Sequence, residues 1–176
     1  MTRVPSGARI ALAAQGSATV ETGLSVLDHL VGELARAGRF RIALEVAPDS
    51  TEEAVVAAGS ALGAAVRERL ETRDAAGLGW AIVPADEALA SASLERDAEP
   101  PRLVTNVDFS DIRVGGVAND VASRFLEELS RAANLNLHVR LLEGDDPQHV
   151  LSAIFKAVGA ALGQACRPVP TTEEDQ

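Results

Sequence analysis

The chain has 176 residues, 47% of them hydrophobic, which is enough for one compact domain or for two tightly joined half-domains. Its formal net charge of −10, with no cluster of basic residues, argues against nucleic acid and anionic membranes as partners, because both bind positive surfaces. The apolar run among the first residues is too short for a secretory signal, and the apolar run Ala54–Val66 is too short for a membrane-spanning helix. We therefore expect a cytoplasmic protein.

The first part of the chain predicts strands, a helix, a strand and a second helix. Leucine and valine recur at spacings of three and four residues from Leu24 onward, which is typical of one helical face, and we expect Gly38 to cap this helix. Residues 39–46 alternate apolar and polar side chains, as a half-buried strand does. The predicted elements are strands Ala8–Ala14 and Ser17–Glu21, a helix Leu24–Ala37, a strand Arg39–Val46 and a helix from Ser50 or Thr51 to about Leu70.

The second part follows a polar, glycine-containing link over Glu71–Gly79. Its predicted elements are strands Trp80–Val83, Glu87–Leu94 and Arg102–Phe109, a loop Asp111–Gly116, a helix Val117–Ala133, a strand Leu135–Leu142 and a long apolar helix that ends near Cys166. Cys166 is the only cysteine, which excludes an internal disulfide framework and a thiolate metal cluster. Its small, apolar neighbours predict a buried side chain rather than a nucleophile.

Two short segments occur twice. Glu33–Ala37 (ELARA) parallels Glu128–Ala132 (ELSRA) at an offset of 95 residues, and Ala61–Val66 (ALGAAV) parallels Ala157–Leu162 (AVGAAL) at an offset of 96. The second copy therefore has one more residue than the first between these two segments. The chain is predicted to consist of half-repeats at about residues 8–71 and 79–166, followed by a polar tail over 167–176. The predicted fold class is α+β, with two similar halves that each pack two helices on one face of a small sheet.

Three longer segments resemble one enzyme family. Thr22–His29 (TGLSVLDH) is similar to the TGxxxLDH segment of imidazoleglycerol-phosphate dehydratases, and Pro84–Leu89 (PADEAL) resembles their PMDEAL segment. Leu137–Ala157 resembles the family's LHIRLLxG…HHxxEAxFKA block. The resemblance covers roughly residues 18–172 and keeps the order of the segments.

This resemblance implies a duplicated fold, ribosomal protein S5 domain 2-like, and a homo-oligomer of up to 24 subunits. It also implies active sites between subunits, with two manganese ions at each. The family reaction removes water from imidazoleglycerol phosphate to give imidazole-acetol phosphate in histidine biosynthesis. The metal-bound imidazole of the substrate loses a proton, and the hydroxyl group then leaves.

The family's metal ligands come from the LDH histidine, the LHI histidine and two helical HHxxE groups. His29 matches the first of these, His138 the second, and His149 the second histidine of the second helical group. All the histidines of the chain therefore fall on ligand positions. Glu52 and Glu53 stand at the two histidines of the first helical group. Imidazole and carboxylate together suit manganese or a similar divalent ion.

The remaining ligand positions depart from the family pattern. Val56 stands at the glutamate of the first helical group, and Gln148 and Ser152 stand at the first histidine and the glutamate of the second. We therefore expect one manganese ion or none, rather than two. Glu52 and Glu53 also have a purely structural interpretation, because acids in a first helical turn stabilise the helix by about 0.3–1 kcal/mol each.

The resemblance also suggests residues for substrate binding, and these too differ from the family. Arg102 lies two residues beyond a family arginine position and could replace it, while alanine and glycine stand where the arginines of the first loop would be. The C-terminal PSTKG segment of the family aligns with Thr171 and Thr172 followed by Glu173, so that an anion replaces a cation. Glu173 beside a phosphate would repel it.

Glu87 and Asp86 are the carboxylates that the resemblance suggests for general acid and base chemistry. The favoured hypothesis is a divergent member of the family without a complete di-manganese site and without normal dehydratase activity. It would bind copies of itself, an authentic dehydratase subunit, or a different small molecule in the old cleft. The alternative is an active lyase in which Glu52 and Glu53 rebuild the metal site. A structural oligomer with an empty cleft is a third class.

Overall fold

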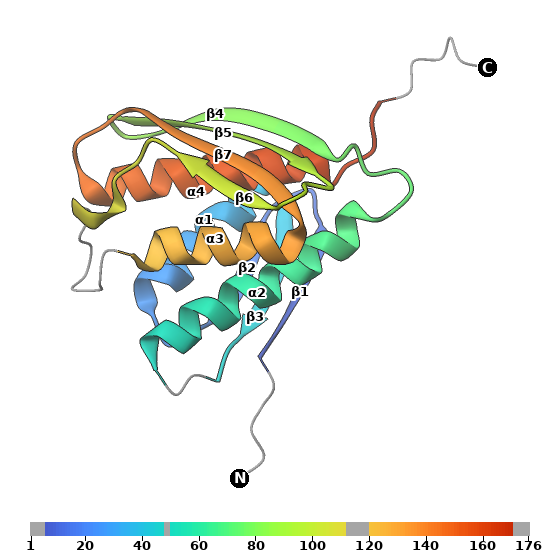
Figure 1. Cartoon of the computed structure of the whole chain (residues 1–176), viewed down its shortest axis with the longest axis horizontal. Helices are drawn as coiled ribbons and strands as arrows, with labels where there is room; N and C mark the ends of the chain where they lie inside the picture. The colour runs from blue at the N-terminus through green and yellow to red at the C-terminus, as the bar shows by residue number, and fades with distance from the viewer. Residues whose placement is uncertain (1–5, 48–49, 112–119, 171–176) are drawn as a thin grey trace.

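The computed structural model describes residues 6–47, 50–111 and 120–170 of the chain. In this part, four α-helices lie between a three-stranded and a four-stranded β-sheet (Figure 1). Each sheet packs on helices of its own half, and the helices of the two halves pack on one another. The expected α+β class, with two similar halves, is confirmed.

The first half consists of β1 (Gly7–Leu12), β2 (Ser17–Glu21), α1 (Ser25–Gly38), β3 (Phe40–Glu45) and α2 (Thr51–Leu70). The strand order is β1-β3-β2, with β1 antiparallel and β2 parallel to β3. Alternate residues of β3 are buried, so one face of this sheet packs on the helices and the other is exposed. This agrees with the alternation predicted for residues 39–46.

The second half repeats this arrangement and adds one strand. Its elements are β4 (Leu78–Ala85), β5 (Ala88–Arg96), β6 (Arg102–Thr105), a 3-10 turn (Phe109–Asp111), α3 (Val121–Ala133), β7 (Leu135–Glu143) and α4 (Pro147–Ala165). The strand order is β4-β5-β7-β6, with β5 antiparallel and β6 parallel to β7. Strands β5, β7 and β6 therefore correspond to β1, β3 and β2, while β4 is additional.

Glycines allow the helices of the two halves to approach closely. Helix α1 packs on α4, and α2 packs on α3. A Cβ atom at Gly159 of α4 would lie only 2.2 Å from the backbone oxygen of Leu34 in α1, and one at Gly63 of α2 would lie 2.7 Å from the backbone oxygen of Leu129 in α3. Backbone therefore rests on backbone at both crossings, where any larger residue would have to push the helices apart.

The predicted role of Gly38 as a helix cap is wrong. Helix α1 ends with Arg39 in the left-handed conformation (φ 53°), and Asn134 (φ 58°) ends α3 at the position 95 residues later. Gly38 is the last helical residue and is buried, with its missing Cβ 2.5 Å from the backbone oxygen of Gly159. Its small size serves the packing of α1 on α4.

The strand predicted over Arg102–Phe109 is too long. It ends at Thr105 because the side chain of Asn106 takes over the pairing: its amide donates to the backbone oxygen of Leu141 (3.2 Å), and its oxygen accepts from the backbone N–H of Leu141 (2.9 Å). Most of the loop predicted over 111–116, and the first residues of the helix predicted from Val117, lie outside the described residues.

Cys166 follows α4 and is fully buried, as predicted. Burial raises the pKa of its thiol to about 11, although the nearby charges of Arg69 and Arg167 act in the opposite direction. The thiol is therefore protonated at neutral pH. A protonated, buried thiol is inert as a nucleophile.

Replacing Gly159 by alanine should lower the free energy of unfolding by about 1–3 kcal/mol, because the added methyl group overpacks the crossing of α1 and α4. The measurement is the midpoint and slope of urea denaturation. The matched control is Ala160→Ser, at the neighbouring half-exposed position of α4, where only a helix-propensity change of about 0.5 kcal/mol is expected. Equal losses in both variants would contradict the close backbone contact.

Candidate functional site

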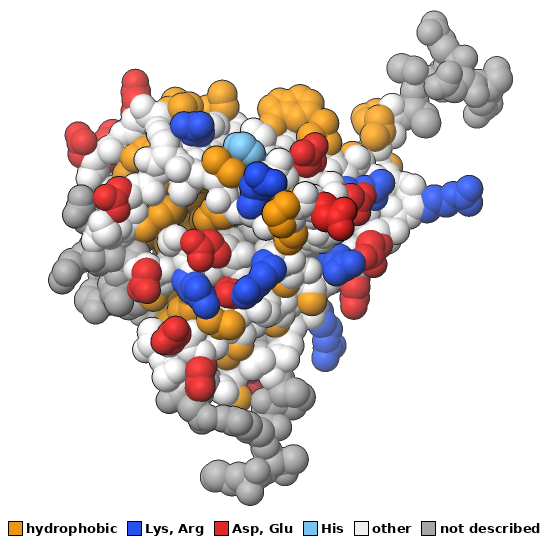
Figure 2. All heavy atoms as spheres, in the orientation of Figure 1, with side chains coloured by type: hydrophobic (Ala, Val, Ile, Leu, Met, Phe, Trp, Pro, Cys, Tyr) orange, Lys and Arg blue, Asp and Glu red, His pale blue; other side chains and the backbone are white. Residues whose placement is uncertain are grey.

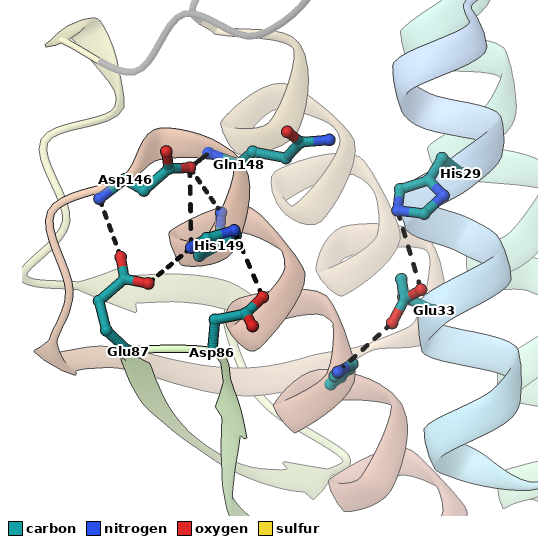
Figure 3. A network of polar contacts seen from close by, with 8 residues as sticks. His29, Glu33, Asp86, Glu87, Asp146, Gln148 and His149 are labelled. Carbon is teal, nitrogen blue, oxygen red and sulfur yellow. Dashed lines mark hydrogen bonds and ion pairs between the residues drawn. The ribbon is translucent and has the colours of Figure 1, made fainter.

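His149 lies in a cluster of carboxylates where the turn between β4 and β5 meets the start of α4 (Figure 3). Its Nδ1 atom is 2.5 Å from Oε2 of Glu87, and its Nε2 atom is 3.3 Å from Oδ2 of Asp86. Asp86 adopts the left-handed conformation (φ 50°) in this turn. The two ring nitrogens of His149 thus face two different carboxylates.

Asp146 holds this cluster at the start of the helix. Its carboxylate accepts hydrogen bonds from the backbone N–H groups of Gln148 (2.9 Å) and His149 (3.2 Å), which caps α4. Its own backbone N–H donates to Oε1 of Glu87 (3.1 Å). Glu87 therefore bridges the cap and the imidazole. The turn before α4 was predicted from the sequence. The contact between Asp146 and Glu87 was not, because the two residues lie 59 positions apart.

The charges in this cluster support one another. The hydrogen bond from His149 holds the pKa of Glu87 below its usual value, helped by the backbone N–H groups of Glu87 and Asp146. The same hydrogen bond raises the pKa of His149, against a smaller effect of desolvation. An imidazolium paired with a carboxylate is therefore favoured here. The side chains are partly exposed, so solvent screens the pair.

His29 lies in a second, separate group of polar contacts (Figure 3). It is on α1 with a 55% exposed side chain, and its Nε2 atom is 3.8 Å from Glu33. Glu33 also binds Arg36 (2.7 Å) and lies 3.7 Å from Lys156 of α4. Partial burial would raise the pKa of Glu33, but the hydrogen bond from Arg36 and the charges of Arg36 and Lys156 outweigh it, and the pKa is lowered.

Thr22 and Asp28, which precede His29 in the chain, have a structural role of their own. Thr22 is fully buried, and its hydroxyl donates to Oδ1 of Asp28 (2.5 Å), which also accepts from the backbone N–H of Thr22 (3.1 Å). This closes the loop between β2 and α1 onto the first turn of the helix. The position of His29, next to Asp28, is fixed by this closure.

His138 and Arg102 share the outer face of the second sheet. In β7, Leu137 and Val139 are buried toward the helices, so His138 points to the other face. It pairs with Ser93 on one side and Val104 on the other. Arg102 pairs with Asn136 on the same face and is exposed, with a 3.5 Å hydrogen bond from its Nε to the backbone oxygen of Pro100.

Glu52 and Glu53 lie in the exposed first turn of α2. Ser50, and not Thr51, caps this helix, since its hydroxyl oxygen accepts from the backbone N–H of Glu53 (3.2 Å). Neither carboxylate has a hydrogen-bond or ion-pair partner among the described residues. Val56, one turn further along, is half-buried.

The three histidines therefore occupy three different parts of one chain: α1, the outer face of the second sheet, and the start of α4. Within residues 6–47, 50–111 and 120–170, no three His, Cys, Asp or Glu side chains are grouped so as to hold a metal ion. Of the predicted site residues, the structure brings together His149, Glu87 and Asp86. Thr171 and Thr172 lie outside the described residues.

Replacing Glu87 by glutamine should lower the pKa of His149, because the hydrogen bond to this carboxylate is the main cause of its rise. The measurement is an NMR titration of the imidazole protons, with His149→Gln to assign the resonance. The control is Glu68→Gln on the exposed side of α2, which should leave the midpoint of His149 unchanged.

Linkage gives the corresponding dependence of stability on pH. Because the pKa of His149 is raised in the folded state, this residue stabilises the fold. The stabilisation is complete at pH values below about 6.5, the pKa of histidine in the unfolded chain, and is lost as the pH rises through the pKa of the folded state. The lowered pKa of Glu87 contributes above its unfolded value of about 4.3 and is lost as the pH falls. The stability difference between wild type and Glu87→Gln should therefore be largest between these values. A difference independent of pH would contradict the ion pair.

On the face seen in Figure 2, acidic and basic side chains are interspersed, and apolar side chains stand along the rim where Figure 1 places β4. The exposed apolar residues of β4 are Leu78, Trp80 and Ile82. No helix in the described part of the chain is both long and apolar enough to cross a lipid bilayer.

Comparisons with known proteins agree on one family. The family model for imidazoleglycerol-phosphate dehydratase matches residues 22–162. The chain is 37% identical over 162 residues to the imidazoleglycerol-phosphate dehydratase of Desulfitobacterium hafniense, covering 88% of this chain and 81% of that protein. It is 34% identical over 163 residues to the one from Pelobacter propionicus, covering 90% and 83%.

Solved structures of such enzymes have the same fold. The enzyme from Staphylococcus aureus superposes with a TM-score of 0.80 at 24% identity, over 91% of this chain and 92% of that one. The enzyme from Pyrococcus furiosus superposes with a TM-score of 0.77 at 25% identity, over 99% and 97%. By its sequence match and its fold, this chain belongs to the imidazoleglycerol-phosphate dehydratase family.

Proposed function

We propose that this chain is a divergent member of its histidine-biosynthesis family, one that lacks a complete di-manganese site and does not catalyse the normal dehydration. The observation that carries the proposal is Val56. It stands where the family motif has the glutamate of the first helical ligand group, and its side chain has no oxygen or nitrogen to offer a metal. Gln148 and Ser152 replace two further ligands by weak neutral donors.

The surroundings of His149 support the same proposal. A histidine binds a metal through the lone pair of a neutral imidazole. Here Glu87 lies 2.5 Å from Nδ1 and Asp86 lies 3.3 Å from Nε2, so both nitrogens face carboxylates. A proton on each nitrogen satisfies both contacts. His149 is then an ion-pair partner rather than a ligand.

The placement of the ligand candidates supports an assembly. His29, His138 and His149 lie on separate parts of one chain, and a site that uses more than one of them needs residues from neighbouring subunits. We therefore propose a homo-oligomer, with the outer face of the second sheet, which carries His138 and Arg102, at a subunit contact. Arg102 keeps exposed N–H groups that a phosphate could accept from.

A second candidate function is an active lyase with a rebuilt metal site. Nε2 of His149 and Oδ2 of Asp86, which lie 3.3 Å apart, would be donors to the ion, and Glu87 would orient the imidazole ring through Nδ1. Glu52 and Glu53, whose carboxylates have no partner in the described part of the chain, would add oxygen ligands. Manganese at this site would supply positive charge as a Lewis acid, and Glu87 or Asp86 would move the proton.

Metal content distinguishes the two functions. After incubation with excess manganese and removal of unbound ion, elemental analysis should find fewer than two manganese ions per chain. An assay for imidazole-acetol phosphate should find no turnover above the uncatalysed rate. Two ions per chain together with dehydration of imidazoleglycerol phosphate would establish the active lyase and overturn the favoured function.

Restoring the family ligands should restore metal binding. The variant carries Glu52→His, Glu53→His, Val56→Glu, Gln148→His and Ser152→Glu, and we expect it to bind more manganese per chain than the wild type, because each change supplies a ligand of the family pattern. The measurement is the same elemental analysis.

The matched control carries Arg67→His and Glu68→His at exposed positions of α2. It adds imidazoles to the same helix without completing the pattern, so its manganese content should stay at the wild-type level. A restored variant that binds no more manganese than this control would show that the ligand positions are not aligned as the family motif implies.

A further inference from the structure

We draw no further inference here: the strongest candidate, the exposed apolar stripe that Leu78, Trp80 and Ile82 of β4 form on the outer face of the second sheet, carries nothing because nothing in the structure shows what covers it.

Discussion

The crossing of α1 and α4 is the contact on which the rest of the molecule depends. It joins the two halves through backbone-to-backbone contact, which requires glycine at 38, 159 and 163. Arg167 stabilises the same crossing by hydrogen bonds to both helices. Its guanidinium donates to the backbone oxygens of Gly38 (2.9 Å) and Arg39 (2.9 Å) at the end of α1 and to the backbone oxygen of Gly163 (2.7 Å) in α4. These are carbonyls that a helix end leaves without intrahelical partners. The relative placement of His29 on α1 and His149 on α4 follows from this crossing.

Much of the fold could be predicted from the sequence because hydrophobic periodicity and duplication are local signals. The alternation over residues 39–46 predicted β3, and the repeated ELARA and ELSRA segments led to the α+β fold with two similar halves. The errors came from tertiary contacts. Glycine is a common residue at helix caps, but Gly38 serves the packing of α1 on α4. Asn106 ends β6 through a hydrogen bond to Leu141, a residue 35 positions later in the sequence.

The candidate site was predictable only as a set of residues. Motif matching identified His29, His138 and His149, but their placement depends on strand register and helix crossing. A one-residue change in register would turn His138 from the outer face to the core. The contact between Glu87 and His149 joins residues 62 positions apart and has no local signal. The three histidines lie on α1, β7 and α4, and no sequence motif shows how far apart these elements place them.

The fold does not depend on the ligand positions, and this explains how a member of the family can change them. Glu52 and Glu53 are exposed in a first helical turn, where acids are favoured by about 0.3–1 kcal/mol each. His149 is partly exposed and pairs with Glu87 and Asp86. The glycine crossings and the aliphatic core lie elsewhere. Substitution at the positions that the family motif assigns to metal ligands should therefore cost little stability. Substitution at Gly159 should lower the stability and leave the chemistry of the site unchanged.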